Sequence, residues 1–137
     1  MFYQKIINIT TSGREIIDIT HKVKEIVVES SAKTGLCHIF LHHTSASLIL
    51  CENADPLVQR DLEAFMQRFI PDGDVLYQHT AEGPDDMPSH VRTVLTSSFL
   101  IIPITENQLG LGRWQGIYLW EHRLRSHHRK ITVTLQG

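Results

Sequence analysis

Three histidines stand where regular elements are expected to begin or end, at positions from which their side chains could share one metal ion. His43 follows an apolar run, His79 lies in a polar stretch, and His90 lies in the first turn of an expected helix. Imidazole is the commonest metal ligand, and three protein ligands with an open fourth position are typical of catalytic zinc. Such a metal lowers the pKa of a bound water to about 7 or polarises a substrate oxygen. The sequence therefore predicts a metal site made by His43, His79 and His90.

A plainer interpretation of the same histidines stays open. The chain holds nine histidines in 137 residues, and no HxH or HExxH spacing marks a zinc motif among them. Each of the three could therefore be an ordinary surface or hydrogen-bonded side chain. Ser45 and Ser47 lie close to His43, but no Gly-x-Ser-x-Gly motif surrounds them, which disfavours a serine nucleophile.

Charged residues near these histidines could supply further chemistry. Asp86 lies one helical turn before His90 and could orient its ring. Glu52 could act as a general base, or it could be a solvated carboxylate at a strand end. A guanidinium group matches the oxygens of a phosphate, although a surface ion pair is the alternative role for an arginine. Three arginines are candidates for a substrate phosphate: Arg92, Arg113 and Arg123.

The elements that must position these residues alternate between strands and helices. Strand-like patterns, among them nearly continuous apolar runs at 36–41 and 46–51, predict strands over 2–10, 15–19, 36–41, 46–51, 99–104, 113–122 and 130–135. Helical periodicity predicts helices over 21–31, from Asp55-Pro56 to Pro71, and over 86–96, with a long loop over 72–85. We expect the first two strands to form an opening hairpin and the last two a closing hairpin. The pattern favours an α+β fold with a largely antiparallel sheet or sandwich and two main helices.

Two finer expectations follow from these periodicities. In the strand over 36–41, His38 and His42 share one face, and His43 shares the other face with the buried run, so at most one of His42 and His43 can face a given cavity. The second helix carries an apolar stripe that we expect to pack into the core. That stripe consists of Val58, Leu62, Phe65, Met66 and Phe69.

Composition bounds the class of protein. With 137 residues and 42% hydrophobic residues, the chain is expected to form a single domain over residues 1–137. A formal net charge of -2 without long runs of like charge disfavours nucleic-acid and membrane partners. No signal peptide is recognised, and Cys37 and Cys51 lie in apolar runs typical of buried thiols, so we expect a cytoplasmic protein. Uncovered strand edges in so small a domain favour a homo-oligomer.

Five segments together resemble the YjbQ family, whose members are described as secondary thiamine-phosphate synthase-like proteins. They are HTSAS at 43–47, ENADP at 52–56, EGPDDMPSH at 82–90, GRWQGIYLWEHR at 112–123 and LQG at 135–137. The resemblance implies a compact α+β fold, a homotrimer, and a polar pocket rich in histidine and acidic residues. The family pattern has histidines at the positions of His43, His79, His90 and His122, and it includes Glu121. We therefore expect four candidate catalytic residues: Glu52, Asp86, Arg113 and Glu121.

The activity that the resemblance implies joins a pyrimidine-methyl diphosphate to a thiazole phosphate and releases pyrophosphate. A diphosphate leaving group is usually neutralised by Mg²⁺ and basic side chains, whereas three histidines suit zinc better than Mg²⁺. We therefore expect a metal-assisted enzyme acting on a phosphorylated small molecule, with thiamine-phosphate synthesis as a secondary activity. The alternatives are a non-catalytic trimeric protein that binds an anion or a metal, and a metal-dependent hydrolase.

Overall fold

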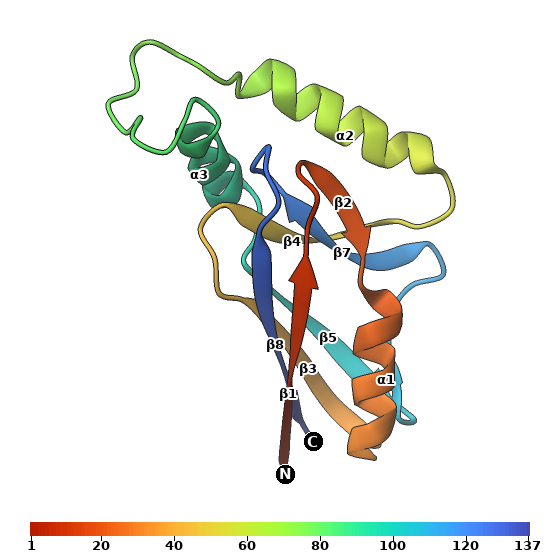
Figure 1. The fold of residues 1–137 in the computed structure, drawn as a ribbon. Coiled ribbons are helices and arrows are strands. Elements are labelled where there is room, and N and C mark those ends of the chain that lie inside the picture. Colours follow the sequence, from red (N-terminus) through yellow and green to blue (C-terminus); the bar gives the residue numbers. More distant parts are fainter.

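The computed structural model of the protein describes residues 1–137 and contains two antiparallel sheets and three helices (Figure 1). From edge to edge, the larger sheet contains β1 (Phe2–Thr10), β8 (His128–Gln136), β3 (Thr34–Leu41), β5 (Phe99–Thr105) and β6 (Gln108–Leu109). The smaller sheet contains β2 (Glu15–Asp18), β7 (Gln115–Glu121) and β4 (Ala46–Glu52). The helices are α1 (Thr20–Ser30), α2 (Pro56–Phe69) and α3 (Asp86–Leu95).

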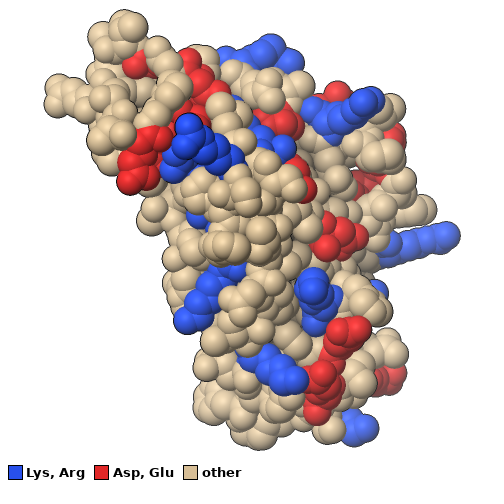
Figure 2. Space-filling model, in the orientation of Figure 1, with Lys and Arg blue, Asp and Glu red and all other residues tan.

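The predicted α+β class and the antiparallel pairing are confirmed. All three helices begin and end close to the predicted positions, and none of them is both long and apolar enough to cross a membrane. On the face drawn in Figure 2, lysine and arginine are interspersed with aspartate and glutamate. This face therefore carries no large field of one sign.

Both predicted hairpins are wrong, because each pair of strands is divided between the two sheets. β1 pairs with β8, whereas β2 pairs with β7. The chain crosses between the sheets near Gly13, which has a φ of +139° and whose added Cβ would lie 2.7 Å from the Leu124 carbonyl oxygen. All nine residues of β1 pair with β8, whereas β2 has only four residues. The long-range pairing therefore satisfies more backbone groups than the local hairpin could.

The main core lies between α1 and the two sheets. Val23 and Val27 of α1 are fully buried there, as are Ile39 of β3, Leu119 of β7 and Ile131 of β8. Full burial of a side chain of this kind contributes about 1.5–3 kcal/mol relative to exposure. Packing in the core thus fixes the positions of both sheets and α1 relative to one another, and these elements in turn position the polar residues.

The two cysteines are free thiols, as the sequence predicted. Cys37 is fully buried in the core, and burial raises its pKa to about 12. Burial also raises the pKa of the half-buried Cys51. A nucleophilic cysteine needs a lowered pKa, so neither thiol is activated for chemistry.

Helix α2 begins as predicted, but its apolar stripe is only partly buried. Asp55 Oδ1 accepts a hydrogen bond from the backbone N–H of Leu57 at 2.9 Å, just before the helix. Met66 is 8% exposed, whereas Phe65 and Phe69 are 51% and 59% exposed and stack on each other. The expectation that the whole stripe packs into the core is therefore wrong. The reason is that α2 rests on a sheet of only three strands, which covers one edge of the stripe.

Ion pairs also hold α2 to the rest of the protein. Glu63 of α2 accepts from Arg92 of α3 at 3.0 Å and from Trp120 Nε1 of β7 at 3.0 Å. Beyond the end of α2, Asp72 accepts two hydrogen bonds of 2.7 Å from the guanidinium of Arg14. Paired hydrogen bonds of this kind fix orientation as well as distance. They set the position of the loop over 72–85, which follows α2.

Two substitutions of large apolar residues distinguish the core from the exposed edge of α2. We expect Leu119→Ala to lower the free energy of unfolding by about 2–5 kcal/mol, because it leaves a cavity in a fully buried site. Phe65→Ala should cost less than about 1 kcal/mol, because half of that ring is already exposed. Urea unfolding followed by circular dichroism measures both values. Equal losses in the two variants would contradict the burial described for α2.

Candidate metal centre

Two histidines and one carboxylate meet where the loop over 72–85 runs into α3. The ligand atoms of His79, Asp86 and His90 all lie within 4.8 Å of one another. Asp86 is the first residue of α3, and His90 follows one turn later, so the helix presents both side chains on the same face. His79 reaches them from the loop. Asp86 Oδ2 lies 2.7 Å from His79 Nε2 and 3.4 Å from His90 Nε2.

The ring of His90 is oriented by a backbone carbonyl. Its Nδ1 lies 2.9 Å from the carbonyl oxygen of Thr44, in the turn between β3 and β4. A carbonyl can only accept, so Nδ1 must carry a proton and donate it. In the neutral ring, Nε2 then holds the lone pair, and this nitrogen is the one that faces Asp86.

Asp86 is almost entirely buried and ionised. Burial opposes ionisation, but the hydrogen bond from His79 and the charge of Arg123 outweigh it, so the pKa of Asp86 lies below its ordinary value. Arg123 Nη1 lies 3.0 Å from Asp86 Oδ1. The centre therefore contains a permanent negative charge at neutral pH, with one oxygen toward the arginine and the other toward the histidines.

His43 lies outside this group of three. Its Nε2 accepts a hydrogen bond of 2.8 Å from the backbone N–H of Lys130. Burial, followed by the charge of Arg129, lowers the pKa of His43, so its ring is neutral at neutral pH. The proton of the neutral ring must then reside on Nδ1. The expectation that His42 and His43 do not face the same cavity is confirmed. His42 is exposed, and its ring forms a hydrogen bond of 2.7 Å with Thr132 Oγ1.

Two cavities flank the centre. The first has a volume of about 550 Å³ and is lined by His43, His90 and Phe99, together with a set of hydroxyl groups. Those hydroxyl groups belong to Thr44, Thr93, Thr96, Ser97 and Ser98. The second cavity, of about 460 Å³, is lined by His79 and by loop residues that include Tyr77. A ligand in either cavity would therefore touch one histidine of the centre.

Glu121 is fully buried away from both cavities. It accepts from Arg129 Nε at 2.8 Å and from Thr11 Oγ1 at 2.8 Å, and its second oxygen contacts Arg129 Nη2. Arg129 Nη2 also donates to the carbonyl oxygen of Ser45 at 3.1 Å. Glu121 thus holds the turn whose Thr44 carbonyl orients His90, and it acts on the centre through other residues.

The other residues singled out by sequence are separate from the centre. Glu52 is exposed and accepts from the backbone N–H of Asp55 at 3.2 Å. Arg113 is exposed, and its guanidinium lies 4.9 Å from the centre of the Trp114 ring. The structure therefore brings together His79, His90 and Asp86 from the candidate set. The Asp86–His90 spacing was the available signal that Asp86 could be a ligand as well as an orienting group.

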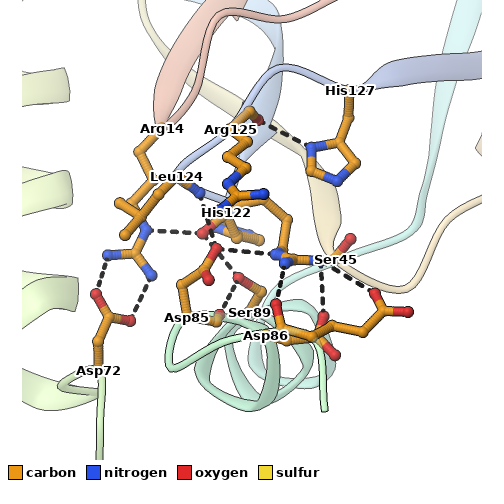
Figure 3. A network of polar contacts seen from close by, with 12 residues as sticks. Arg14, Ser45, Asp72, Asp85, Asp86, Ser89, His122, Leu124, Arg125 and His127 are labelled. Carbon is orange, nitrogen blue, oxygen red and sulfur yellow. Dashed lines mark hydrogen bonds and ion pairs between the residues drawn. The ribbon is translucent and has the colours of Figure 1, made fainter. Parts of the chain in front are cut away.

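His122 is fully buried, and it lies between the side chains of Arg14 and Ser89 (Figure 3). Its Nε2 lies 2.8 Å from Ser47 Oγ, and its carbonyl oxygen accepts from Arg14 Nε at 2.7 Å and from Ser89 Oγ at 2.7 Å. Burial, followed by the charge of Arg92, lowers the pKa of His122 to about 3. Its ring is therefore neutral, and its backbone connects β7 to α3 and to the β1–β2 crossing.

Comparison with known proteins identifies close relatives over the whole chain. Residues 5–137 match the family model described as UPF0047 protein YjbQ-like. A UPF0047 protein of Synechocystis is 47% identical over 98% of this chain and 92% of its own length. The UPF0047 protein YjbQ of Escherichia coli is 40% identical over 100% of this chain and 99% of its own length. These relatives are named by family alone.

Solved structures agree with the fold. A YjbQ/UPF0047-family protein from Clostridium acetobutylicum is 36% identical with a TM-score of 0.88, covering 96% of this chain and 99% of that chain. A protein of unknown function from Sulfolobus solfataricus is 26% identical with a TM-score of 0.87, covering 100% of this chain and 99% of that chain. The α+β fold is therefore shared with these proteins.

Removal of the Glu121 carboxylate should destabilise the fold. Glu121→Gln leaves the Arg129 guanidinium buried without its counter-charge, which typically costs about 3–5 kcal/mol. Glu52→Gln is the matched control, because that carboxylate is exposed, and it should change the free energy of unfolding by less than about 0.5 kcal/mol. Urea unfolding measures both. A Glu121→Gln variant as stable as the wild type would contradict the role given to this pair.

The neutral His122 should make stability depend on pH. An unfolded histidine binds a proton below about pH 6.5, whereas folded His122 stays neutral to about pH 3. Between these values the unfolded chain binds more protons, so the free energy of unfolding falls as the pH falls, by about 1.4 kcal/mol per pH unit. His122→Gln should remove this contribution to the slope between about pH 4 and about pH 6. Urea unfolding at both pH values provides the test, and equal slopes would contradict it.

Proposed function

The chain belongs to the UPF0047 YjbQ-like family, and from this premise we propose that it is a metal-assisted enzyme acting on a phosphorylated small molecule. The observation that carries the proposal is the approach of His90 Nε2 to Asp86 Oδ2 at 3.4 Å. In its neutral form, His90 would present a lone pair at Nε2, because its Nδ1–H donates a hydrogen bond to the carbonyl oxygen of Thr44. Two acceptors at this distance repel each other unless a cation, either a proton or a metal ion, stands between them.

The donor set favours a metal ion of the zinc class. Two imidazoles and one carboxylate are the ligands of many catalytic zinc sites, and the same set also binds ferrous iron. Mg²⁺ prefers oxygen ligands, so it fits this centre less well. We assign His79, Asp86 and His90 as the ligands. A divalent cation held there would lower the pKa of a bound water or polarise a phosphate oxygen.

The cavity of about 550 Å³ supports a phosphorylated substrate. Its walls carry no carboxylate, so a phosphate would meet no like charge there. The hydroxyl groups of Thr44 and Ser98 could donate to a phosphate, whereas those of Thr93, Thr96 and Ser97 already donate to backbone carbonyls. His43 was a predicted ligand, but its Nε2 is occupied by Lys130 N–H and its Nδ1 carries the ring proton. We propose that His43 donates this Nδ1 proton in a hydrogen bond to the substrate.

Thiamine-phosphate synthesis remains the candidate secondary activity. Of the three arginines considered for the substrate, Arg92 is paired with Glu63 and Arg123 with Asp85 and Asp86. Arg113 alone has no carboxylate partner. Arg113 lines neither of the two cavities beside the centre, so the charge of a diphosphate leaving group would be neutralised mainly by the bound metal. A bound metal without free arginines favours a broader activity on phosphorylated compounds, with metal-dependent hydrolysis as a specific alternative.

A homotrimer is part of the same proposal. On the outer face of the larger sheet, the strand register places exposed apolar side chains beside one another. Phe40 pairs with Phe99, and Ile101 pairs with His38 on the same face. Phe40, Phe99 and Ile101 are 48%, 57% and 50% exposed. An apolar surface of this kind is typical of an interface between subunits.

Metal analysis of untagged protein purified without chelators provides the decisive experiment. We expect about one zinc-class ion per chain, and a loss of affinity of more than about 100-fold in His79→Ala, His90→Ala and Asp86→Asn, since even outer-shell changes cost 10–100-fold. His21→Ala, on the exposed face of α1, is the control and should keep the metal. Wild-type protein without a stoichiometric metal would remove the central element of the proposal.

The substrate class is tested with the same metal-loaded protein. Release of pyrophosphate from a pyrimidine-methyl diphosphate and a thiazole phosphate reports transfer, and release of phosphate from p-nitrophenyl phosphate reports hydrolysis. Each activity should disappear in Asp86→Asn and should fall in His43→Ala without loss of the metal. Metal-loaded protein that is inactive on every phosphorylated compound would favour the non-catalytic binding protein. Size-exclusion chromatography with light scattering measures whether each variant keeps the subunit number of the wild type.

A further inference from the structure

At the junction between the loop over 72–85 and α3, Arg123 contacts Glu82 and two residues that are labelled in Figure 3, Asp85 and Asp86. Its Nε donates to Asp85 Oδ2 at 2.9 Å, and its Nη1 lies 3.0 Å from Asp86 Oδ1. Its Nη2 donates to the carbonyl oxygen of Glu82 at 2.9 Å. The side chain of Arg123 is only 9% exposed. Each of the three guanidinium nitrogens therefore contacts an acceptor within the protein.

The surroundings of Arg123 hold it in this position. Asp85 Oδ2 accepts a second hydrogen bond, of 2.9 Å, from the backbone N–H of Leu124. If Arg123 turned toward a substrate, it would leave two buried carboxylates without a counter-charge, which is costly. Binding of a substrate phosphate is therefore not the role that these contacts support.

The contact with Asp86 determines which carboxylate oxygen faces the histidines. Arg123 takes Oδ1, and Oδ2 alone lies toward His79 and His90. A cation between the histidines would then meet a carboxylate that offers one oxygen. Such a ligand suits small ions of low coordination number, whereas Ca²⁺ takes 6–8 oxygen ligands and often uses both carboxylate oxygens.

The contact with Glu82 acts on a second ligand. Glu82 belongs to the loop that carries His79, and the ring of His79 is 54% exposed and contacts Asp86. Little else holds that ring, so its position depends on the path of the loop. By bonding the Glu82 carbonyl, Arg123 joins this loop to the end of β7.

We propose that Arg123 is a positioning residue of the metal centre, which turns Asp86 Oδ2 toward the cation and fixes the loop that presents His79. This inference rests on the proposed function, because it assumes that His79, Asp86 and His90 bind a metal. It assigns Arg123 a role through other residues and no contact with the substrate. Partners of metal ligands that act in this way change metal affinity by about 10–100-fold when they are removed.

Titration of metal-free protein with Co²⁺ tests the proposal, because the visible spectrum of bound cobalt reports its coordination. We expect Arg123→Met and Arg123→Lys to bind cobalt about 10–100-fold more weakly than the wild type, with a spectrum shifted toward higher coordination number. The lysine keeps the charge, but one ammonium group cannot reproduce the three directions of the guanidinium fork. Arg125→Met is the matched control, because Arg125 is exposed and its side chain forms no ion pair.

Each outcome of the titration is decisive. If the wild type and both Arg123 variants bind cobalt with equal affinity and identical spectra, the role of Arg123 is overturned while the proposed function stands. If the wild type binds no cobalt, the proposed function fails, and the role of Arg123 in ligation fails with it. Circular dichroism verifies folding, and Arg123→Lys decides the question if Arg123→Met does not fold.

Limited proteolysis of the metal-free protein tests the effect on the loop separately. Chymotrypsin can cleave after Tyr77 in the loop over 72–85. Cleavage at this site should be several-fold faster in Arg123→Met than in Arg125→Met, because the loop loses its bond to the end of β7. Equal rates of cleavage would overturn the part of the proposal that concerns His79.

Discussion

The buried ion pair between Glu121 and Arg129 stands where the two sheets separate, and the candidate centre depends on it. Six connections of the chain pass from one sheet to the other, and the three that meet at this pair run between β1 and β2, between β3 and β4, and between β7 and β8. Thr11 of the first connection and Ser45 of the second both bond this pair, whose members belong to β7 and β8. A buried pair contributes little net stability over apolar packing, but it fixes geometry, because each unpaired charge would be costly.

The polar network connects this ion pair to His90 and so orients the ring of one candidate ligand. Arg129 donates a hydrogen bond to the carbonyl of Ser45, and the neighbouring carbonyl of Thr44 accepts a hydrogen bond from His90 Nδ1. His90 then directs its other nitrogen at Asp86, whose second oxygen is held by Arg123. The three candidate ligands thus differ in rigidity, since Asp86 and His90 stand on a helix and His79 comes from a loop. Sites on regular elements are held more closely than sites on loops.

Electrostatics explains why arginines surround the centre without facing the cavities. Arg14, Arg92 and Arg123 each pair with a carboxylate, and together they join α2, α3 and the loop over 72–85 to the smaller sheet. These helices bury few apolar side chains apart from the small cluster around Met66 and Trp120. Charge-assisted hydrogen bonds therefore set their positions. The positive charge that a phosphorylated substrate requires would consequently come from a bound cation, in accord with the proposed function.

The sequence alone was sufficient to predict the elements, the α+β class and the resemblance to one family. Apolar periodicity and local chemistry, such as the Asp55-Pro56 helix start, involve residues that are close in the chain. They can therefore be recognised without a structure. The sequence also separated His42 from His43, since strand alternation is a local property.

How the elements combine depends on contacts between residues that are far apart in the chain. The division of β1 and β2 between two sheets depends on β8, more than 100 residues away, and no local pattern encodes that choice. The same holds for His43, whose Nε2 is occupied by the backbone of Lys130, and for Glu121, whose position in a sequence motif does not reveal that Arg129 buries it. Asp86 was visible as a neighbour of His90, but its place between two histidines required the loop to fold back onto α3. Polar partners that are distant in sequence meet because the core and the strand pairing bring them together, and this is information that residue spacing does not contain.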